Sequence, residues 1–271
     1  MPTDLGDVLH YFIPEAETGQ AAPAARPASG ASSHRFAGSI RPAALPLIGV
    51  PIGEQDVVRA AFAWNLAVEI GRLGARAAIV SPGCDEVAAL WPVEGVSPMG
   101  SEVVTTPAAN LGALYRDALD LAVERAADAG DGGVVLVRVP PGWLRDPEGG
   151  GPLLRWSLLF TSSDPRDLLE TYGLTKLLCA AHPTPRVGVT VHGARRIGEA
   201  EAAFSRLARS TAHHLGRELT SYGLLVDDLH VYRAIVDKRP IGLAHPQSPA
   251  ARCLRDVAQL LLQDAREIAG A

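Results

Sequence analysis

From Leu45 onward, short continuous apolar runs alternate with longer stretches in which apolar residues recur at helical spacing. Continuous runs, as opposed to strict alternation, are typical of strands buried on both faces of a parallel sheet. The predicted strands are Leu47–Pro51, Ala77–Val80, Val134–Val139, Ser157–Thr161, Val187–Val191 and Gly223–Val226. The predicted helices include Val57–Leu73, Leu111–Ala129, Pro165–Ala180 and Ile197–Leu219. This order predicts an α/β fold with a doubly wound, mostly parallel sheet and helices on both faces.

A last helix is predicted near the end of the chain. Ser248 stands where an N-cap is expected, and Pro249 follows at the first helical position. The apolar stripe of this helix consists of Leu254, Val257, Ala258, Leu261 and Ile268. We therefore expect one α/β domain over residues 45–271.

The first 44 residues follow a different pattern, in two parts. Residues 1–14 form a short amphipathic motif, which Asp4 can cap and Pro14 ends. Its apolar positions at helical spacing are Leu5, Val8, Leu9, Phe12 and Ile13. Residues 15–44 are rich in Ala, Pro, Ser and Gly and contain almost no large apolar side chain. Such a stretch cannot bury enough surface to offset its ordering entropy, which predicts a flexible, disordered linker.

Composition narrows the class of protein. The hydrophobic fraction of 47% suits a globular core, and the net charge of −5 gives no general attraction to nucleic acid or anionic lipid. No apolar run reaches the length of a membrane span, and the N-terminus lacks the pattern of a secretion signal. Three scattered cysteines and eight histidines show no metal-ligand spacing. We expect a cytoplasmic location, no membrane anchoring and no metal.

The turn after the first strand is where such sheets bind ligands, beyond the carboxyl ends of their strands. This turn is followed by Asn65-Leu66-Ala67 and then by Leu73-Gly74. In type and spacing these elements resemble the MinD/ParA/FlhG family of deviant Walker ATPases. That family carries K-G-G-x-G-K-S/T, then a helix with N-L-A, then L-G-x-x-V-L-L-V-D-x-D. The resemblance covers about residues 45–262 and implies a P-loop NTPase-like fold.

Within this resemblance, the loop that would hold phosphate and magnesium is degenerate. Counted back from Asn65, the family's two lysines, glycines and magnesium-binding hydroxyl fall on Glu54, Gln55, Asp56, Val58, Arg59 and Ala60. A P-loop needs glycines so that backbone N–H groups can wrap the phosphates, and carboxylates would repel them. The loop is therefore predicted to be a plain strand–helix connection, with weak residual nucleotide binding through Arg59 as the alternative.

Other positions of the family's nucleotide site also differ. Ser81 and Gly83 replace the two aspartates of L-V-D-x-D, and Arg138 replaces the Walker B aspartate before Pro140-Pro141-Gly142. His192 stands where the family usually has an asparagine that contacts the base. Without these carboxylates nothing would hold magnesium or orient a water. The resemblance thus implies a pseudo-ATPase with no catalytic residue and no cofactor.

Three functions remain open at this stage. The first is a non-catalytic regulator or adaptor in a MinD/FlhG-like positioning system, with protein partners bound by the N-terminal motif and the domain surface, and with a possible homodimer. The second is a divergent ATP-binding ATPase that serves positioning or partitioning. The third is a ParA-like protein that contacts DNA through Arg206, Arg209 and Arg217, but nearby Glu199, Glu201 and Glu218 favour a solvated helix face and make nucleic acid unlikely.

Overall fold

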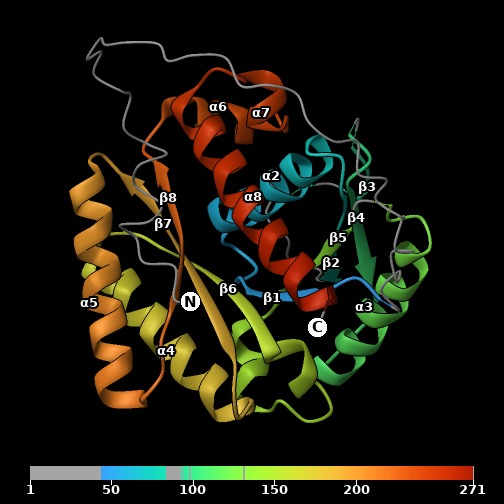
Figure 1. Ribbon diagram of the computed structural model, residues 1–271, viewed down its shortest axis with the longest axis horizontal. Helices are drawn as coiled ribbons and strands as arrows, with labels where there is room; N and C mark the ends of the chain where they lie inside the picture. Colours follow the sequence, from blue (N-terminus) through green and yellow to red (C-terminus); the bar gives the residue numbers. More distant parts are fainter. Residues whose placement is uncertain (1–43, 84–91, 93, 98, 131, 271) are drawn as a thin grey trace, which may run out of the picture.

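The computed structural model describes residues 44–83, 92, 94–97, 99–130 and 132–270, with the backbone alone at 269 and 270. Its centre is an eight-stranded sheet in the order β3-β4-β2-β5-β1-β6-β7-β8 (Figure 1). All neighbouring strands run parallel except β3, which pairs antiparallel with β4. The strands are β1 Leu47–Pro51, β2 Arg76–Pro82, β3 Gly95–Val96, β4 Glu102–Thr106, β5 Gly133–Val139, β6 Trp156–Thr161, β7 Arg186–Ala194 and β8 Thr220–Val226.

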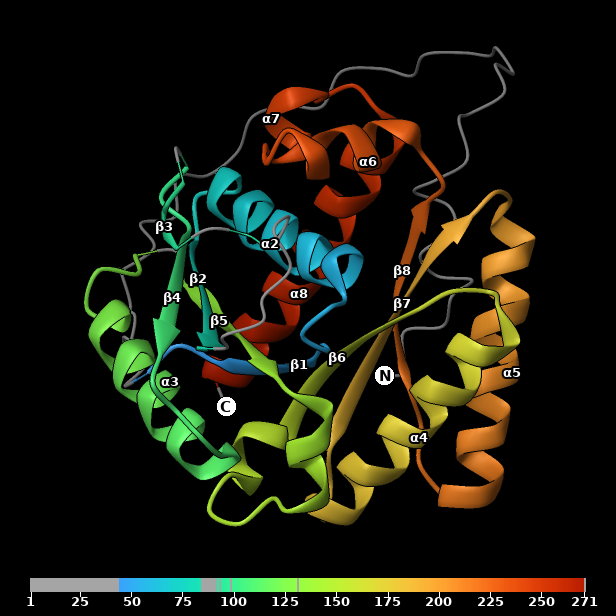
Figure 2. The same cartoon turned by 180° about the vertical axis from the view of Figure 1, so that it is seen from behind.

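Helices cover both faces of the sheet, which confirms the predicted doubly wound class (Figures 1 and 2). The helices are α2 Val57–Arg72, α3 Leu111–Ala126, α4 Pro165–Ala181, α5 Ile197–Leu215, α6 Leu229–Val236, α7 Ile241–Ala244 and α8 Pro249–Gly270. The 3-10 turns η1 Pro141–Arg145 and η2 Gly151–Arg155 link β5 to β6. α2 and α8 pack on each other against one face, and α4 and α5 lie together on the other.

Polar caps fix where the helices begin. The carboxylate of Asp56 accepts the backbone N–H of Arg59 at the start of α2, and Asn110 and Asp164 cap α3 and α4. Asp228 accepts from the N–H groups of His230 and Ala250, so one carboxylate ties the starts of α6 and α8 together. As predicted, Ser248 caps α8, with its Oγ accepting from the N–H of Ala251 at 3.2 Å.

Two departures from the sequence-based elements have clear causes. Strand β4 contains only two apolar residues, so it lacks the continuous run by which the other strands were recognised. The helix expected to reach Leu219 ends at Leu215, because Gly216 adopts φ 61° in the left-handed region. Arg217 therefore lies outside α5 and donates to the carbonyl of Pro183. The proposed DNA-facing row of Arg206, Arg209 and Arg217 on one helix is wrong.

A buried polar network closes the amino-terminal end of the parallel strands. The Tyr222 hydroxyl accepts from Trp156 Nε1 at 3.1 Å and donates to Asp264 Oδ2 at 2.5 Å. Arg186 pairs with the same carboxylate at 2.6 Å and lies over the Trp156 ring. Burial, followed by the charge of Asp264, raises the pKa of Tyr222, so its hydroxyl stays protonated as a donor. β6, β7, β8 and α8 are thus held by one shared set of bonds.

Gly188 is expected to tolerate no side chain. A Cβ at this position of β7 would overlap the Tyr222 ring, whereas a Cβ on Gly173, within α4, would meet nothing within 4 Å. Gly188→Ala should lower the free energy of unfolding by about 1–3 kcal/mol through overpacking. Gly173→Ala should raise it by about 0.5–1 kcal/mol, because alanine favours the helix. Urea unfolding of both variants measures the difference, and equal stabilities would contradict the packing at Tyr222.

Candidate functional site

The turn between β1 and α2 lies at the carboxyl end of the central strand, where the sequence placed the degenerate P-loop. The backbone N–H groups of Asp56, Val57 and Arg59 are hydrogen-bonded within the turn. Asp56 N donates to the Gly53 carbonyl at 3.2 Å, and Val57 N donates to the Gln55 carbonyl at 3.0 Å. The next cap bond uses Arg59 N, which donates to the Asp56 carboxylate at 3.0 Å. These three amides are therefore not free to donate to a phosphate.

Arg59, at the position of the family's loop lysine, points into a group of carboxylates. Its two terminal nitrogens donate to both oxygens of Glu170, at 3.1 and 2.9 Å. Its Nε lies 3.3 Å from Asp56, and a terminal nitrogen lies 3.8 Å from Asp167. Asp167 and Glu170 belong to the first turns of α4, which follows β6, the neighbour of β1 in the sheet. The guanidinium thus bridges α2 and α4 and is itself buried.

The charges around Arg59 disfavour a phosphate. Burial by itself would lower the pKa of Arg59, but the hydrogen bond that Arg59 donates to Glu170 and the charges of Asp56, Glu170 and Asp167 together raise it. The guanidinium is therefore fully charged, and three carboxylates share that single cation. An incoming phosphate would have to displace a bidentate partner and approach the remaining carboxylates, which repel it.

His192, at the end of β7, borders the same cluster. Its ring packs on Phe62 of α2 with centroids 5.3 Å apart. Its Nε2 is buried and makes no hydrogen bond. Burial, and then the charge of Arg59, lower the pKa of this imidazole, so it is neutral near pH 7. The residue that the resemblance assigned to base recognition is thus packed against a helix side chain.

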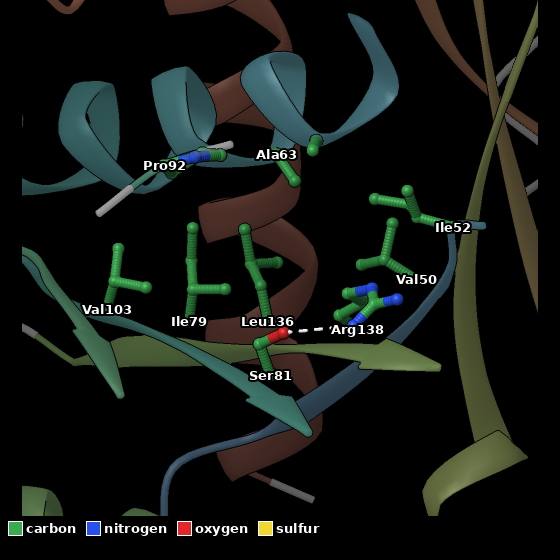
Figure 3. Close-up of a pocket in the computed structure, with 10 residues that line it drawn as sticks. Val50, Ile52, Ala63, Ile79, Ser81, Pro92, Val103, Leu136 and Arg138 are labelled. Carbon is green, nitrogen blue, oxygen red and sulfur yellow. Dashed lines mark hydrogen bonds between the residues drawn. The ribbon is translucent and has the colours of Figure 1, made fainter. Parts of the chain in front are cut away.

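A second part of the site lies beneath α2 (Figure 3). Arg138 is 3% exposed, and its NH1 donates to Ser81 Oγ at 3.3 Å and to the Pro82 carbonyl at 3.4 Å. Arg138 and Ser81 line a cavity of about 20 Å³, whose walls are otherwise apolar and include Val50 and Leu136. The volume matches about one water molecule. A cation therefore occupies the Walker B position, and it contacts the residue that replaces the first aspartate of L-V-D-x-D.

The structure places the other predicted positions of the loop as follows. Glu54 and Gln55 are exposed in the turn. Val58 and Ala60 lie in the first turn of α2, which needs no left-handed backbone, so the glycine conformation of a P-loop has no counterpart there. The N-terminal residues Leu5, Val8, Leu9, Phe12 and Ile13 lie outside the described residues. Within the described ranges, no group of His, Cys, Asp or Glu is arranged to hold a metal ion, and no helix could cross a membrane.

Sequence reasoning missed the two carboxylates of α4. Asp167 and Glu170 are three residues apart near the start of a predicted helix, which by itself indicates only a favourable charge at a helix N-terminus. Their role depends on β6 lying beside β1, which brings the start of α4 next to the start of α2. That strand order is the information that would have paired them with Arg59.

Solved structures with the same fold include a MinD cell-division ATPase and a ParA family ATPase. MinD of Pyrococcus furiosus matches with a TM-score of 0.57 and 14% identity, over 80% of this chain and 98% of that one. A ParA family ATPase of Chlorobium tepidum matches with a TM-score of 0.53 and 12% identity, over 80% and 99%. The fold, with its turn at the carboxyl end of β1, is that of the P-loop NTPases of MinD/ParA type.

Sequence similarity narrows this class further. The antiactivator FleN of Pseudomonas aeruginosa is 29% identical over 144 residues, which are 53% of this chain and 46% of FleN. The chain thus matches about half the length of this curated relative. No protein-family model matches the chain. The chain is thus similar in sequence to part of FleN, and its fold is that of the MinD and ParA ATPases.

Removal of the Arg59 guanidinium should destabilise the domain. Arg59→Gln leaves Asp56, Asp167 and Glu170 facing one another without a cation. Because these carboxylates are partly exposed, we expect a loss of about 1–3 kcal/mol in urea unfolding, less than for a fully buried pair. Arg166→Gln, at an exposed position of α4, should change stability by less than about 0.5 kcal/mol.

The double variant Arg59→Gln, Glu170→Gln tests the attribution to this cluster. It should recover part of the loss, since one of the repelling charges is removed. If Arg59→Gln alone were as stable as the parent, the ion pairs from α2 to α4 would contribute nothing to the free energy of unfolding.

His192 should make stability fall as the solution is acidified. Its folded pKa lies below its ordinary value of about 6.5, so below that pH the unfolded chain binds the proton more readily. This contribution is therefore lost as pH falls from about 7 to about 5. His192→Asn should flatten the pH dependence of the free energy of unfolding in this window. Identical profiles for the parent and His192→Asn would contradict the burial argument.

Proposed function

We propose that the chain is a non-catalytic MinD/FlhG-like pseudo-ATPase, a regulator or adaptor that acts through protein–protein contacts in positioning a cellular machine. The observation that carries this proposal is the bidentate pair of Arg59 and Glu170. The cation that stands for the P-loop lysine is satisfied by the protein itself, and the neighbouring amides are bonded within the turn. The domain supplies, from its own side chains, the anion that a nucleotide would bring.

The magnesium side of the site supports the same reading. Arg138 places a positive charge where the family has a metal-binding carboxylate, and Ser81 and Gly83 offer no carboxylate in exchange. A divalent cation would be repelled there, and phosphoryl transfer in this fold depends on such a cation. By contrast, the MinD of Pyrococcus horikoshii, a structure of the same fold with a TM-score of 0.56, was solved in complex with Mg-ADP.

Protein partners are proposed from the relatives and from the N-terminal motif. FleN is described as an antiactivator, and MinD of Aquifex aeolicus was solved as a MinC:MinD complex. Both descriptions concern proteins that act on other proteins. Here the motif with Leu5, Val8, Leu9, Phe12 and Ile13 would supply an apolar face to such a partner, and the domain surface would supply another. The second candidate, a divergent ATP-binding ATPase, differs in requiring Arg59 to leave Glu170.

ATP should be neither bound nor hydrolysed by the purified full-length chain. We expect no magnesium-dependent phosphate release above that of a buffer blank, and no change in melting temperature with millimolar ATP and magnesium. A ligand at about 100 times its dissociation constant stabilises the native state by about 2.7 kcal/mol, which a melting curve detects readily. Turnover that Arg59→Ala abolishes, or a melting temperature raised by several degrees, would favour the ATPase candidate instead.

A further inference from the structure

A groove runs along the solvent side of α4 and α5. Its volume is about 670 Å³, and its floor is formed by Leu168 and Tyr172 of α4 together with Leu207 of α5. The Tyr172 and His214 rings meet edge to face across it, with centroids 6.5 Å apart. Leu169, also on its wall, is 71% exposed. The groove thus presents apolar side chains that no described part of the chain covers.

The charged residues that line this groove are basic. Lys176 and Arg206 lie on opposite walls, one on each helix, and no aspartate or glutamate is among the described residues that line the groove. This contrasts with the net charge of −5 over the whole chain. The acidic residues of α4, Asp167 and Glu170, are directed to Arg59 and the turn after β1. The groove therefore suits a segment that is apolar on one side and acidic on the other.

The chain itself contains a segment of that chemistry. Residues 4–13 carry five apolar side chains at helical spacing, together with Asp4 and Asp7, and no lysine or arginine. A helix of this kind docks by laying its apolar stripe into a groove between two helices. We propose that residues 4–13 occupy the α4–α5 groove of their own domain. The aspartates then face Lys176 and Arg206, and the leucines and Phe12 cover Leu168, Leu169 and Tyr172.

The connecting chain is long enough for this contact. Residues 14–44 separate the motif from the start of the domain, and about 30 residues span up to ~100 Å when extended. A domain of this size has a radius of gyration of about 17 Å, so every part of its surface is within reach. At its average extension of roughly 30 Å, such a tether gives a local concentration in the millimolar range. A weak contact is therefore populated within one chain before it is populated between chains.

The inference rests on the proposed function in one respect: the motif that fills the groove is the motif assigned to partner binding. While the motif is docked in the groove, it is not available to a partner. A partner that binds the motif must therefore displace it from groove residues such as Leu169 and Arg206. The groove thus supplies a regulation that needs no nucleotide. Its test does not involve ATP, so that failure of this contact and failure of the pseudo-ATPase assignment give different results.

Disulfide trapping in the full-length chain tests the contact. Gly6→Cys is combined with Ser210→Cys, which lies on the groove, or with Ser205→Cys, which is exposed on the same helix and does not line it. After mild oxidation, peptide mass spectrometry identifies the bonded cysteines, and a non-reducing gel separates bonds within one chain from bonds between chains. We expect at least about five-fold more intrachain bond at Ser210 than at Ser205.

A charge exchange tests the specificity of the same bond. Arg206→Glu should lower its yield about three- to five-fold, and adding Asp7→Arg should restore it. Leu169→Asp should lower it as well, whereas the melting temperature should stay within about 2 °C of the parent because both positions are exposed. Equal yields at Ser205 and Ser210, bonds only between chains, or a yield indifferent to Arg206→Glu would each overturn the proposal.

Discussion

The ion pair between Arg59 and Glu170 determines how the carboxyl end of the sheet is organised. It joins the first turn of α2 to the first turns of α4 across two neighbouring strands, β1 and β6. The guanidinium is buried, whereas its carboxylate partners are partly exposed. Water therefore screens the charges of the carboxylates and weakens the ion pair. The same cation also contacts Asp56, whose second role is to cap α2. Positioning of the helix, capping of its N-terminus and neutralisation of three carboxylates are therefore achieved by one group of side chains.

The Walker B position next to this cluster also carries a charge opposite to the one that a nucleotide site needs, because Arg138 stands there. In a P-loop site a basic loop and an acidic metal position are complementary to a nucleotide with magnesium. Here Glu54 and Asp56 stand in the loop beside the cation Arg59, and the cation Arg138 stands at the metal position. The central strands β1, β5 and β6 are buried almost throughout, and most of their buried residues are apolar. Burial of these strands stabilises the fold and does not depend on the residues of the turn after β1.

The sequence was sufficient for the elements whose signals are local. Strand β1 was predicted residue for residue, because a continuous apolar run between polar turns has few other structures open to it, and Ser248 with Pro249 marked the start of α8. The sequence was not sufficient where an element depends on which strands are adjacent, or on the φ angle of a single residue such as Gly216. The helix α5 was predicted four residues too long because Leu219 follows Leu215 at helical spacing, and β4 was missed because it contains only two apolar residues. The changed positions of the P-loop could be found from their spacing to Asn65 in the sequence. The pairing of Arg59 with Glu170 could not, because it depends on β6 lying beside β1.

If the nucleotide site is closed in this way, control of the protein has to come from another contact. A ligand shifts an equilibrium only by its difference in affinity for two states, and under the proposed function a nucleotide offers no such difference, because Arg59 is already paired with Glu170. A tethered segment does offer one, since its local concentration is set by the chain and its release by a competitor. The α4–α5 groove lies on the outer side of the helix whose inner side binds Arg59. Occupation of the groove and the position of α4 are thus physically linked, and α4 is the element through which a surface contact could reach the former nucleotide site.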